Sequence, residues 1–211
     1  MNLFGSLFNN QKSTYKLSYF NIRFRGEFLR FIFAYAGQPY EDNRIEQANW
    51  PLLKPTFPFE QLPVLEVKNG NNVLILAQSL AIARYLGNEF NLNGRNATET
   101  ALIDMYGSQV ADLFNSLGMV RISNLTESTF NQTWGTNLRF FETRLERNRN
   151  GYLVGSRLSW ADIYLSQITE RLENRKNEVL NNFPRIRDLD QKIRSLSRIA
   201  EWIRNRPNSE I

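Results

Sequence analysis

The sequence predicts two consecutive domains: a small α+β domain built on a mixed four-stranded sheet, followed by an all-α domain. Two observations lead to this fold class. Strand and helix patterns alternate in the first part of the chain, whereas only helical patterns follow residue 97. The length of 211 residues suits two small packed domains, and a hydrophobic content of 42% can supply their cores.

The elements of the first part are identified from residue alternation, apolar runs and turn residues. Gly37 and Gly87 each follow an apolar run and predict a helix end, while Asn69-Gly70 predicts a hairpin turn. The predicted elements are a strand at 15–20, a helix at 26–36, strands at 40–45, 63–67 and 73–76, and a helix at 79–86. A strand–helix–strand unit implies a parallel pair, and the hairpin adds antiparallel strands, as in a thioredoxin-like domain.

Composition and helical periodicity set the remaining boundaries. Residues 1–14 are expected to form an N-terminal extension, residues 15–88 the first domain and residues 97–211 the helical domain, with a polar linker between the two domains. The predicted helices of the second domain are 97–121, 127–147, 160–173, a short segment near Glu178, and 185–204.

The sharpest local signal lies at the start of the helix predicted at 160–173. Ser159 can cap the backbone N–H of Asp162, whose carboxylate can reach back to the N–H of Ser159, and Leu158 and Ile163 occupy the staple positions. We expect this motif to be structural, so that Asp162→Ala costs about 1 kcal/mol or more without removing a catalytic group.

Composition excludes several kinds of chemistry. The chain has no Cys and no His, which rules out disulfides, thiolate or imidazole metal sites, cysteine nucleophiles and histidine bases. Its net charge of +5 comes from interspersed acids and bases, which argues against nucleic acid as a partner. There is no run of about 18 apolar residues that would predict a membrane span. Residues 1–13 do not resemble a secretory signal, so a cytoplasmic location is expected.

Four motifs occur in an order that is jointly specific. They are Tyr15-Lys-Leu-Ser-Tyr-Phe-Asn, the pair Trp50-Pro-Leu-Leu-Lys and Pro58-Phe-Glu-Gln-Leu-Pro-Val-Leu-Glu, Gln78-Ser-Leu-Ala-Ile-Ala-Arg-Tyr-Leu, and the capping box at Ser159. Together they resemble the cytosolic glutathione transferases. The pattern is most similar to the sigma class, which includes haematopoietic prostaglandin D synthase, invertebrate detoxifying transferases and lens S-crystallins. The resemblance extends from Tyr15 to the C-terminus.

The resemblance implies that Tyr19 and Arg25 are the catalytic residues. The phenol O–H of Tyr19 would donate a hydrogen bond to the glutathione sulfur and stabilise the thiolate, which is the nucleophilic form of a thiol. Arg25 would lie beside Tyr19, where its charge further favours the thiolate. Without the resemblance, Tyr19 would be interpreted as a strand residue packed in the core, and Arg25 as an exposed charge.

The same resemblance implies a glutathione site on several segments. Gln78 and Ser79 open a helix whose N-terminal amide groups suit the γ-glutamyl carboxylate, although Ser79 alone would be interpreted as a helix cap. A cis peptide bond at Leu62-Pro63 would turn the backbone groups of Leu62 toward the cysteinyl amide.

The glycyl end of glutathione is expected to meet Trp50, Lys54 and Gln61, with Lys54 paired to the glycyl carboxylate. The chain departs from the family nearby, because the family commonly has Gly where this chain has Glu60. An extra carboxylate beside an anionic tripeptide weakens binding unless it points to water.

The helix predicted at 97–121 carries the expectations about partners. Asp112 matches a residue that reaches across a dimer to the glutathione amino group, so a homodimer is expected; alone, Asp112 would be interpreted as a charge on a polar helix face. A mammalian member of the class binds a divalent ion with an acidic cluster here. This chain has Ser108 and Ala111 at the matching positions, so no metal is expected.

An electrophile pocket is expected between the domains, lined by Phe20, Arg25, Met119 and Ile211. The resemblance therefore implies conjugation of glutathione, the co-substrate, to small hydrophobic electrophiles in detoxification. Two alternatives stay open. One is a glutathione-dependent prostaglandin D synthase, against which Met119 replaces a pocket Trp. The other is a catalytically weak, S-crystallin-like structural or binding protein, for which Glu60 leaves room.

Overall fold

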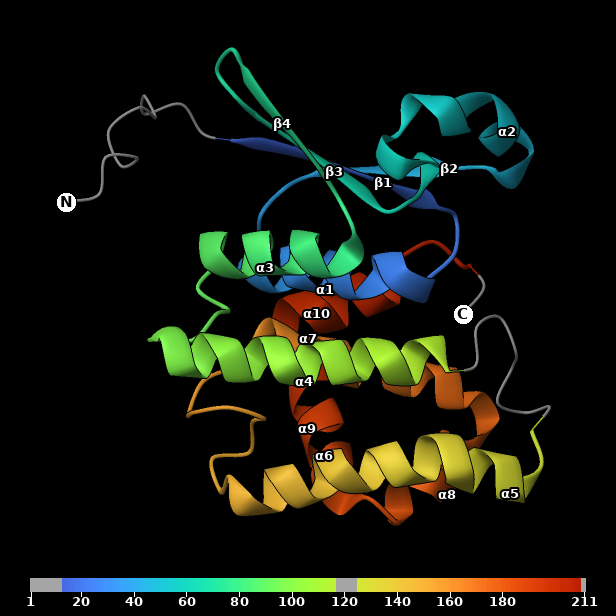
Figure 1. Ribbon diagram of the computed structural model, residues 1–211, viewed down its shortest axis with the longest axis vertical. Coiled ribbons are helices and arrows are strands. Elements are labelled where there is room, and N and C mark those ends of the chain that lie inside the picture. Colours follow the sequence, from blue (N-terminus) through green and yellow to red (C-terminus); the bar gives the residue numbers. More distant parts are fainter. Residues whose placement is uncertain (1–12, 117–124, 210–211) are drawn as a thin grey trace.

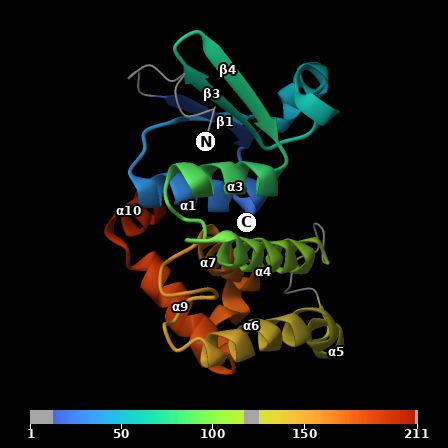
Figure 2. The same ribbon diagram turned by 60° about the vertical axis from the view of Figure 1, so that its left-hand side comes forward.

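The computed structural model describes residues 13–116 and 125–209 as a sheet stacked on layers of helices (Figure 1). The sheet lies at one end, α1 (Phe24–Ala36) and α3 (Ser79–Glu89) lie beneath it, and the other long helices extend away from that pair. Figure 2 shows the same order of layers from a second direction. The predicted fold class, a mixed four-stranded sheet followed by an all-α domain, is confirmed.

The sheet has the strand order β2-β1-β3-β4. Its strands are β1 (Thr14–Phe20), β2 (Glu41–Ile45), β3 (Val64–Asn69) and β4 (Asn72–Ala77). The central strand β1 pairs parallel with β2 and antiparallel with β3. The β3–β4 hairpin turns at Gly70, whose φ of 58° is the left-handed conformation that glycine adopts readily. Both predictions, the parallel pair and the hairpin, are confirmed.

The two glycines expected to end helices have different roles. Gly37 ends α1 with a φ of 64°, as predicted. Gly87 does not end the next helix, because α3 continues to Glu89. A Cβ atom at Gly87 would lie 2.8 Å from the ring of Trp160 and 2.7 Å from Oδ1 of Asn93. The absence of a side chain at Gly87 therefore allows α3 to lie against the helical domain.

The segment between β2 and β3 consists of short helical turns. They are η1 (Gln47–Asn49), α2 (Trp50–Leu53), η2 (Lys54–Thr56) and η3 (Pro58–Glu60). This segment stands beside the sheet in Figure 1. None of the residues in these turns is buried, so the segment is an exposed arm of the first domain.

The helical domain is more divided than the periodicity predicted. Its elements are α4 (Ala97–Asn115), α5 (Glu127–Phe130), the π-helical turn η5 (Asn131–Gly135), α6 (Thr136–Arg147), α7 (Trp160–Ile168), η6 (Thr169–Arg175), α8 (Lys176–Asn181), α9 (Pro184–Arg194) and α10 (Ser197–Asn205). The helix predicted at 127–147 thus contains a π turn. The one predicted at 160–173 changes to 3₁₀ geometry after Ile168, and Glu173 leaves helical geometry with a φ of 49°.

The prediction of a single helix at 185–204 is wrong, because this region forms two helices, α9 and α10. The chain breaks at Ser195 and Leu196, where Leu196 adopts a non-helical ψ of 125° before α10 begins. This break turns α10 back toward α1, and Ile199 of α10 is fully buried. Periodicity alone misses the break because α9 and α10 are each amphipathic.

The capping box at the start of α7 is confirmed. Ser159 Oγ accepts from the Asp162 N–H, and Asp162 Oδ2 accepts from the Ser159 N–H at 2.8 Å. Asp162 Oδ1 also accepts from the Leu153 N–H at 2.7 Å, so its carboxylate ties the preceding loop to the helix. Leu158 and Ile163 are buried, as the staple requires.

None of the helices within 13–116 and 125–209 has the length and apolar content needed to cross a membrane.

Candidate active site

Tyr19 lies near the end of β1 with its ring against the first turn of α1. A Cβ atom at Gly26 would lie 2.4 Å from Cδ1 of this ring, so only glycine allows the contact. The Tyr19 side chain is 4% exposed, and its hydroxyl accepts a hydrogen bond from the backbone N–H of Arg25 at 3.2 Å. With that bond accepted, the hydroxyl keeps its own proton available for donation.

The protonation state of Tyr19 follows from its surroundings. Burial raises the pKa of its hydroxyl to about 12, although the Arg25 N–H and the charges of Arg25 and Arg30 act in the opposite direction. The hydroxyl is therefore neutral at neutral pH, and it can act as a hydrogen-bond donor.

Arg25 connects the start of α1 to α4. Its Nη2 donates to Oδ1 of Asn115 at 2.6 Å, and its guanidinium lies 5.5 Å from the ring centroid of Phe114. Phe24, beside it, packs edge-on against Phe114 with centroids 5.0 Å apart. The segment that holds the Tyr19 hydroxyl is thus held against the helical domain.

Three residues that sequence reasoning did not select lie in this neighbourhood. Tyr164 stacks on Phe28 at 4.0 Å, and burial raises the pKa of its hydroxyl while the charge of Arg25 acts in the opposite direction. Arg171 places its guanidinium 4.5 Å from the Phe24 ring and 5.2 Å from the Phe114 ring. Both guanidinium groups thus lie near the Phe114 ring, Arg25 at 5.5 Å and Arg171 at 5.2 Å from its centroid. Of these three residues, only Tyr164 could have been noticed in the sequence, because it lies in the first turns of the helix that the capping box begins.

A second wall is formed where β3 begins and β4 ends. The pairing of Val64 with Ala77 places Leu62-Pro63 beside Gln78. The Leu62-Pro63 bond is cis, as predicted. Gln78 adopts a φ of 71° just before α3, and no side chain caps that helix, so its first amide groups remain available to an anion.

The polar side chains along this wall are close together. Gln78 Nε2 approaches Gln61 Oε1 at 3.5 Å, which connects the start of α3 to the arm between β2 and β3. Ser79 is the first residue of α3. The structure therefore brings together three predicted glutathione-binding residues from two separate segments.

The arm supplies two further predicted residues, Trp50 and Lys54. Phe20, expected in the electrophile pocket, packs edge-on against Trp50 at 5.2 Å, and Trp50 also contacts Phe57 at 5.8 Å. Lys54 Nζ lies 3.3 Å from Oε2 of Glu60. Phe20 and Trp50 thus join the end of β1 to the arm.

The other predicted residues lie elsewhere or outside the described chain. Asp112 is exposed on α4, where it is available to a partner chain. Met119 and Ile211 fall outside the described residues. Within the part that the structure describes, no three acidic side chains are grouped so that they could hold a metal ion.

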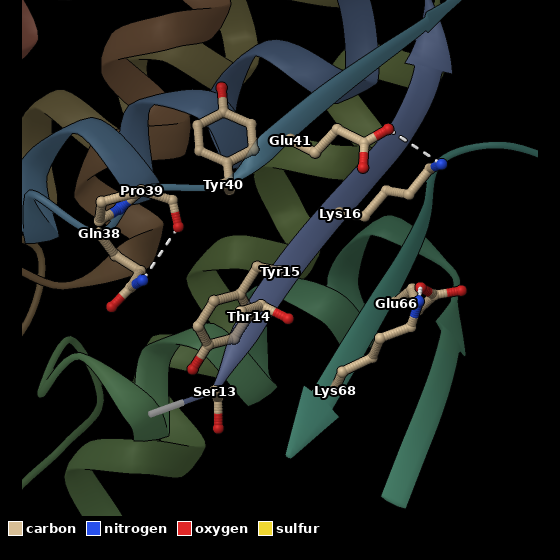
Figure 3. A pocket seen from close by; sticks show the side chains of 10 residues that line it. All are labelled: Ser13, Thr14, Tyr15, Lys16, Gln38, Pro39, Tyr40, Glu41, Glu66 and Lys68. Carbon is tan, nitrogen blue, oxygen red and sulfur yellow. Dashed lines mark hydrogen bonds and ion pairs between the residues drawn. The ribbon is translucent and has the colours of Figure 1, made fainter. Parts of the chain in front are cut away.

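A surface hollow of about 500 Å³ lies at the opposite end of β1 (Figure 3). Its charged side chains are already paired: Lys16 with Glu41 at 3.0 Å, and Lys68 with Glu66 at 2.9 Å. Figure 3 also places the Tyr40 ring beside the hollow. None of the predicted site residues lines it, so it is not the candidate active site.

Comparison with known proteins identifies the family of this chain. Residues 15–88 match the family model "Glutathione S-transferase, N-terminal domain", and residues 113–206 match "Glutathione S-transferase, C-terminal domain". A probable glutathione S-transferase 7 from Caenorhabditis elegans is 38% identical over 203 residues, which cover 92% of this chain and 97% of that protein. The chain belongs to the glutathione transferase family. It is therefore an enzyme that uses glutathione as co-substrate.

Two further relatives of this transferase bear on its class and assembly. The hematopoietic prostaglandin D synthase of Gallus gallus is 37% identical over 202 residues, covering 93% of this chain and 98% of that protein, which supports the sigma-class resemblance. A monomeric transferase from the hookworm Necator americanus has a known structure. It has a TM-score of 0.82 and 34% identity, and the match covers 94% of this chain and 100% of the hookworm chain.

Proposed function

We propose that this transferase conjugates glutathione to small hydrophobic electrophiles and that Tyr19 stabilises the glutathione thiolate. The observation that supports this role is the buried, neutral hydroxyl of Tyr19, which accepts from the Arg25 N–H and retains a proton to donate. A free thiol has a pKa of about 8.5, so a donated hydrogen bond shifts it toward the reactive thiolate at neutral pH. The charge of Arg25 acts in the same direction.

The glutathione backbone is proposed to bind along the wall formed by Leu62, Gln78 and Ser79. The uncapped N-terminus of α3 suits the γ-glutamyl carboxylate, with the Ser79 hydroxyl as an additional donor. The backbone groups of Leu62, beside cis-Pro63, suit the cysteinyl amide in the manner of an added β-strand.

The glycyl end is proposed to lie on the exposed arm of the first domain. Trp50 would contact it, while Lys54 and Gln61 would bind its carboxylate. Residues 15–88 then form the glutathione-binding domain, and residues 97–211 form the helical domain that covers the electrophile. This division keeps the two reactants at one domain boundary, where proximity alone accelerates the reaction.

The electrophile is proposed to bind where the start of α1 faces α4. Arg25 and Phe114 meet at this boundary, and Tyr164 lies close enough to influence both Arg25 and Tyr19. Phe20, Met119 and Ile211 remain proposed members of this pocket. The aromatic rings suit a hydrophobic molecule, and Arg25 can stabilise negative charge that develops as the electrophile is attacked.

We further propose a homodimer in which Asp112 reaches the partner's glutathione amino group. Asp112 and Met105 are seven residues apart and share an exposed face of α4, and Met105 is 51% exposed. Phe59, on the arm, is 73% exposed, and it is proposed to contribute to the same interface. Light scattering during size-exclusion chromatography tests the dimer. A cytoplasmic location, which the sigma-class resemblance implies, is tested by cell fractionation.

A prostaglandin isomerase is the second candidate, favoured by the 37% identity to a hematopoietic prostaglandin D synthase. Product analysis with prostaglandin H2 and glutathione distinguishes it. Formation of prostaglandin D2 at a rate comparable to aryl halide conjugation would support this candidate over general detoxification.

The test of the main proposal is Tyr19→Phe, which removes the hydroxyl, and with it both the donor to sulfur and the acceptor of the Arg25 N–H. Wild type should be retained on immobilised glutathione and should turn over a generic aryl halide. The variant should still bind glutathione but lose about 10²-fold in kcat/KM, the usual cost of one preorganised donor. The absorbance of the bound thiolate should appear at higher pH in the variant. Unchanged turnover in Tyr19→Phe would remove the mechanism.

A further inference from the structure

Glu60 lies at the rim of the proposed glutathione site, next to a cation that the site needs. Its Oε2 is 3.3 Å from Lys54 Nζ, and the two side chains are 57% and 46% exposed. Both groups therefore remain in contact with solvent and can exchange partners. Lys54 is the residue proposed to bind the glycyl carboxylate, so this inference rests on the proposed function.

The backbone holds Glu60 in an unusual conformation. Phe59 and Glu60 have φ values of 55° and 51°, in the left-handed region that side-chain-bearing residues seldom adopt. Two backbone hydrogen bonds secure the turn: the Glu60 N–H donates to the Phe57 carbonyl at 3.0 Å, and the Gln61 N–H donates to the Pro58 carbonyl at 3.3 Å. The direction in which the Glu60 side chain leaves the backbone is therefore set by the turn.

The position of this turn places the carboxylate among the binding residues. Glu60 directly precedes Gln61, which contacts Gln78, and Leu62, whose peptide bond to Pro63 is cis. It is thus adjacent in the chain to the wall proposed for the cysteinyl part. A carboxylate at this point faces the same cation that an incoming glycyl carboxylate would approach.

We propose that Glu60 is a built-in competitor for Lys54 that lowers the affinity of the site for the glycyl carboxylate of glutathione. In the free enzyme, the Glu60 carboxylate occupies Lys54. When glutathione binds, its glycyl carboxylate displaces Glu60 or shares the same cation with it, and the two like charges repel each other. The site consequently discriminates weakly between glutathione and thiols whose glycyl end is uncharged.

The size of the effect follows from solvent exposure. Exposed ion pairs contribute little because water and salt screen them, so removing the competitor should strengthen glutathione binding by about three- to fivefold. Because the interaction is screened, the gain should be larger at low ionic strength and should shrink as salt is added.

The test uses Glu60→Gln, which keeps the shape of the side chain and removes its charge. Calorimetric titration of the full chain at low salt should give a glutathione dissociation constant about three- to fivefold below that of wild type. Glutathione esterified at the glycyl carboxylate should bind wild type and Glu60→Gln equally. The gain should also disappear in a Lys54→Met background.

The matched control is Glu66→Gln, because Glu66 forms a solvent-accessible Lys–Glu pair of similar length with Lys68 on β3, away from the arm. This variant should leave glutathione affinity unchanged, and circular dichroism should show that all variants fold.

An unchanged or higher dissociation constant for Glu60→Gln would overturn the inference while glutathione binding itself stands. An equal gain for glutathione and its ester would also overturn it. Failure of wild type to bind glutathione would instead overturn the proposed function and this inference with it.

Discussion

Two sets of ion pairs in this transferase use the same chemistry in different surroundings. One is buried where α1 meets η6, α9 and α10. The other is the Lys54–Glu60 pair on the exposed arm. An ion pair in solvent is easily exchanged, whereas a carboxylate buried among cations cannot lose a partner without a large penalty. We infer that the buried set stabilises the fold around the site and that the exposed pair sets the affinity of the site for glutathione.

The buried network is centred on Glu170, which is 7% exposed. Its carboxylate pairs with Arg23 at 3.5 Å, Arg194 at 2.9 Å and Arg206 at 3.0 Å. Arg206 also pairs with Glu27 of α1 at 2.7 Å. These contacts join the C-terminal helices to the first turns of α1, the same turns that position the Tyr19 hydroxyl.

Glu170→Ala should have the largest effect, because it leaves three cations without their shared partner. We expect a loss of about 3–5 kcal/mol in the free energy of unfolding, measured by urea denaturation. Glu170→Gln keeps the volume and should recover only part of this loss. A loss below about 1 kcal/mol would show that the network is no more important than a surface pair.

The same carboxylate predicts a dependence on pH. Burial alone would raise the pKa of Glu170, but Arg194 and Arg206 outweigh burial and hold it below its ordinary value. The contribution of Glu170 is therefore complete above about pH 4.3 and is lost as the pH falls through the lower folded pKa. The stability difference between wild type and Glu170→Gln should narrow over that acidic range.

Asp162→Ala should have the next largest effect. The sequence predicted a cost of about 1 kcal/mol from the cap, but the structure adds the Leu153 N–H as a donor to the same buried carboxylate. Leaving several buried donors unsatisfied raises the expected loss to about 3 kcal/mol. Ser159→Ala removes only the hydroxyl that accepts from the Asp162 N–H. It should lower the free energy of unfolding by about 1 kcal/mol in the same denaturation experiment. Equal losses in the two variants would refute the additional role of Asp162.

Lys54→Met should have the smallest effect on stability, although it lies in the proposed site. Because both members of its pair are about half exposed, the free energy of unfolding should change by no more than about 0.5 kcal/mol. Glutathione affinity should nevertheless fall in calorimetric titration. A stability loss comparable to that of Glu170→Ala would contradict the distinction between the two sets of pairs.

Much of the fold could be predicted because its signals are local. Hairpin residues, the glycine at the end of α1, the capping box and the alternation in β1 each act within a few positions along the chain. Tyr19 could be selected only through the family resemblance, because its strand motif alone indicates a residue packed in the core. The cis bond at Leu62-Pro63 was predicted from the same resemblance, and it is present in the structure.

Other features depend on residues distant in sequence. Gly87 resembled a helix end, but its role is to admit Trp160. The break before α10 returns that helix to α1, which no periodicity within 185–204 reveals. Arg25 meets Asn115, and Glu170 meets Arg23, only after the two domains have packed. Glu170 meets Arg206 only after the helices of the second domain have packed.

The sequence by itself therefore determined most of the order of elements and the two-domain class, because short-range backbone and capping interactions encode them, whereas Tyr19 was selected through the family resemblance and its role stays a prediction. Only the tertiary structure decided which ion pairs are buried and which remain in solvent, where their members can exchange partners. Solvent exposure, which sets the strength of each pair, is a property of the packed chain rather than of any segment.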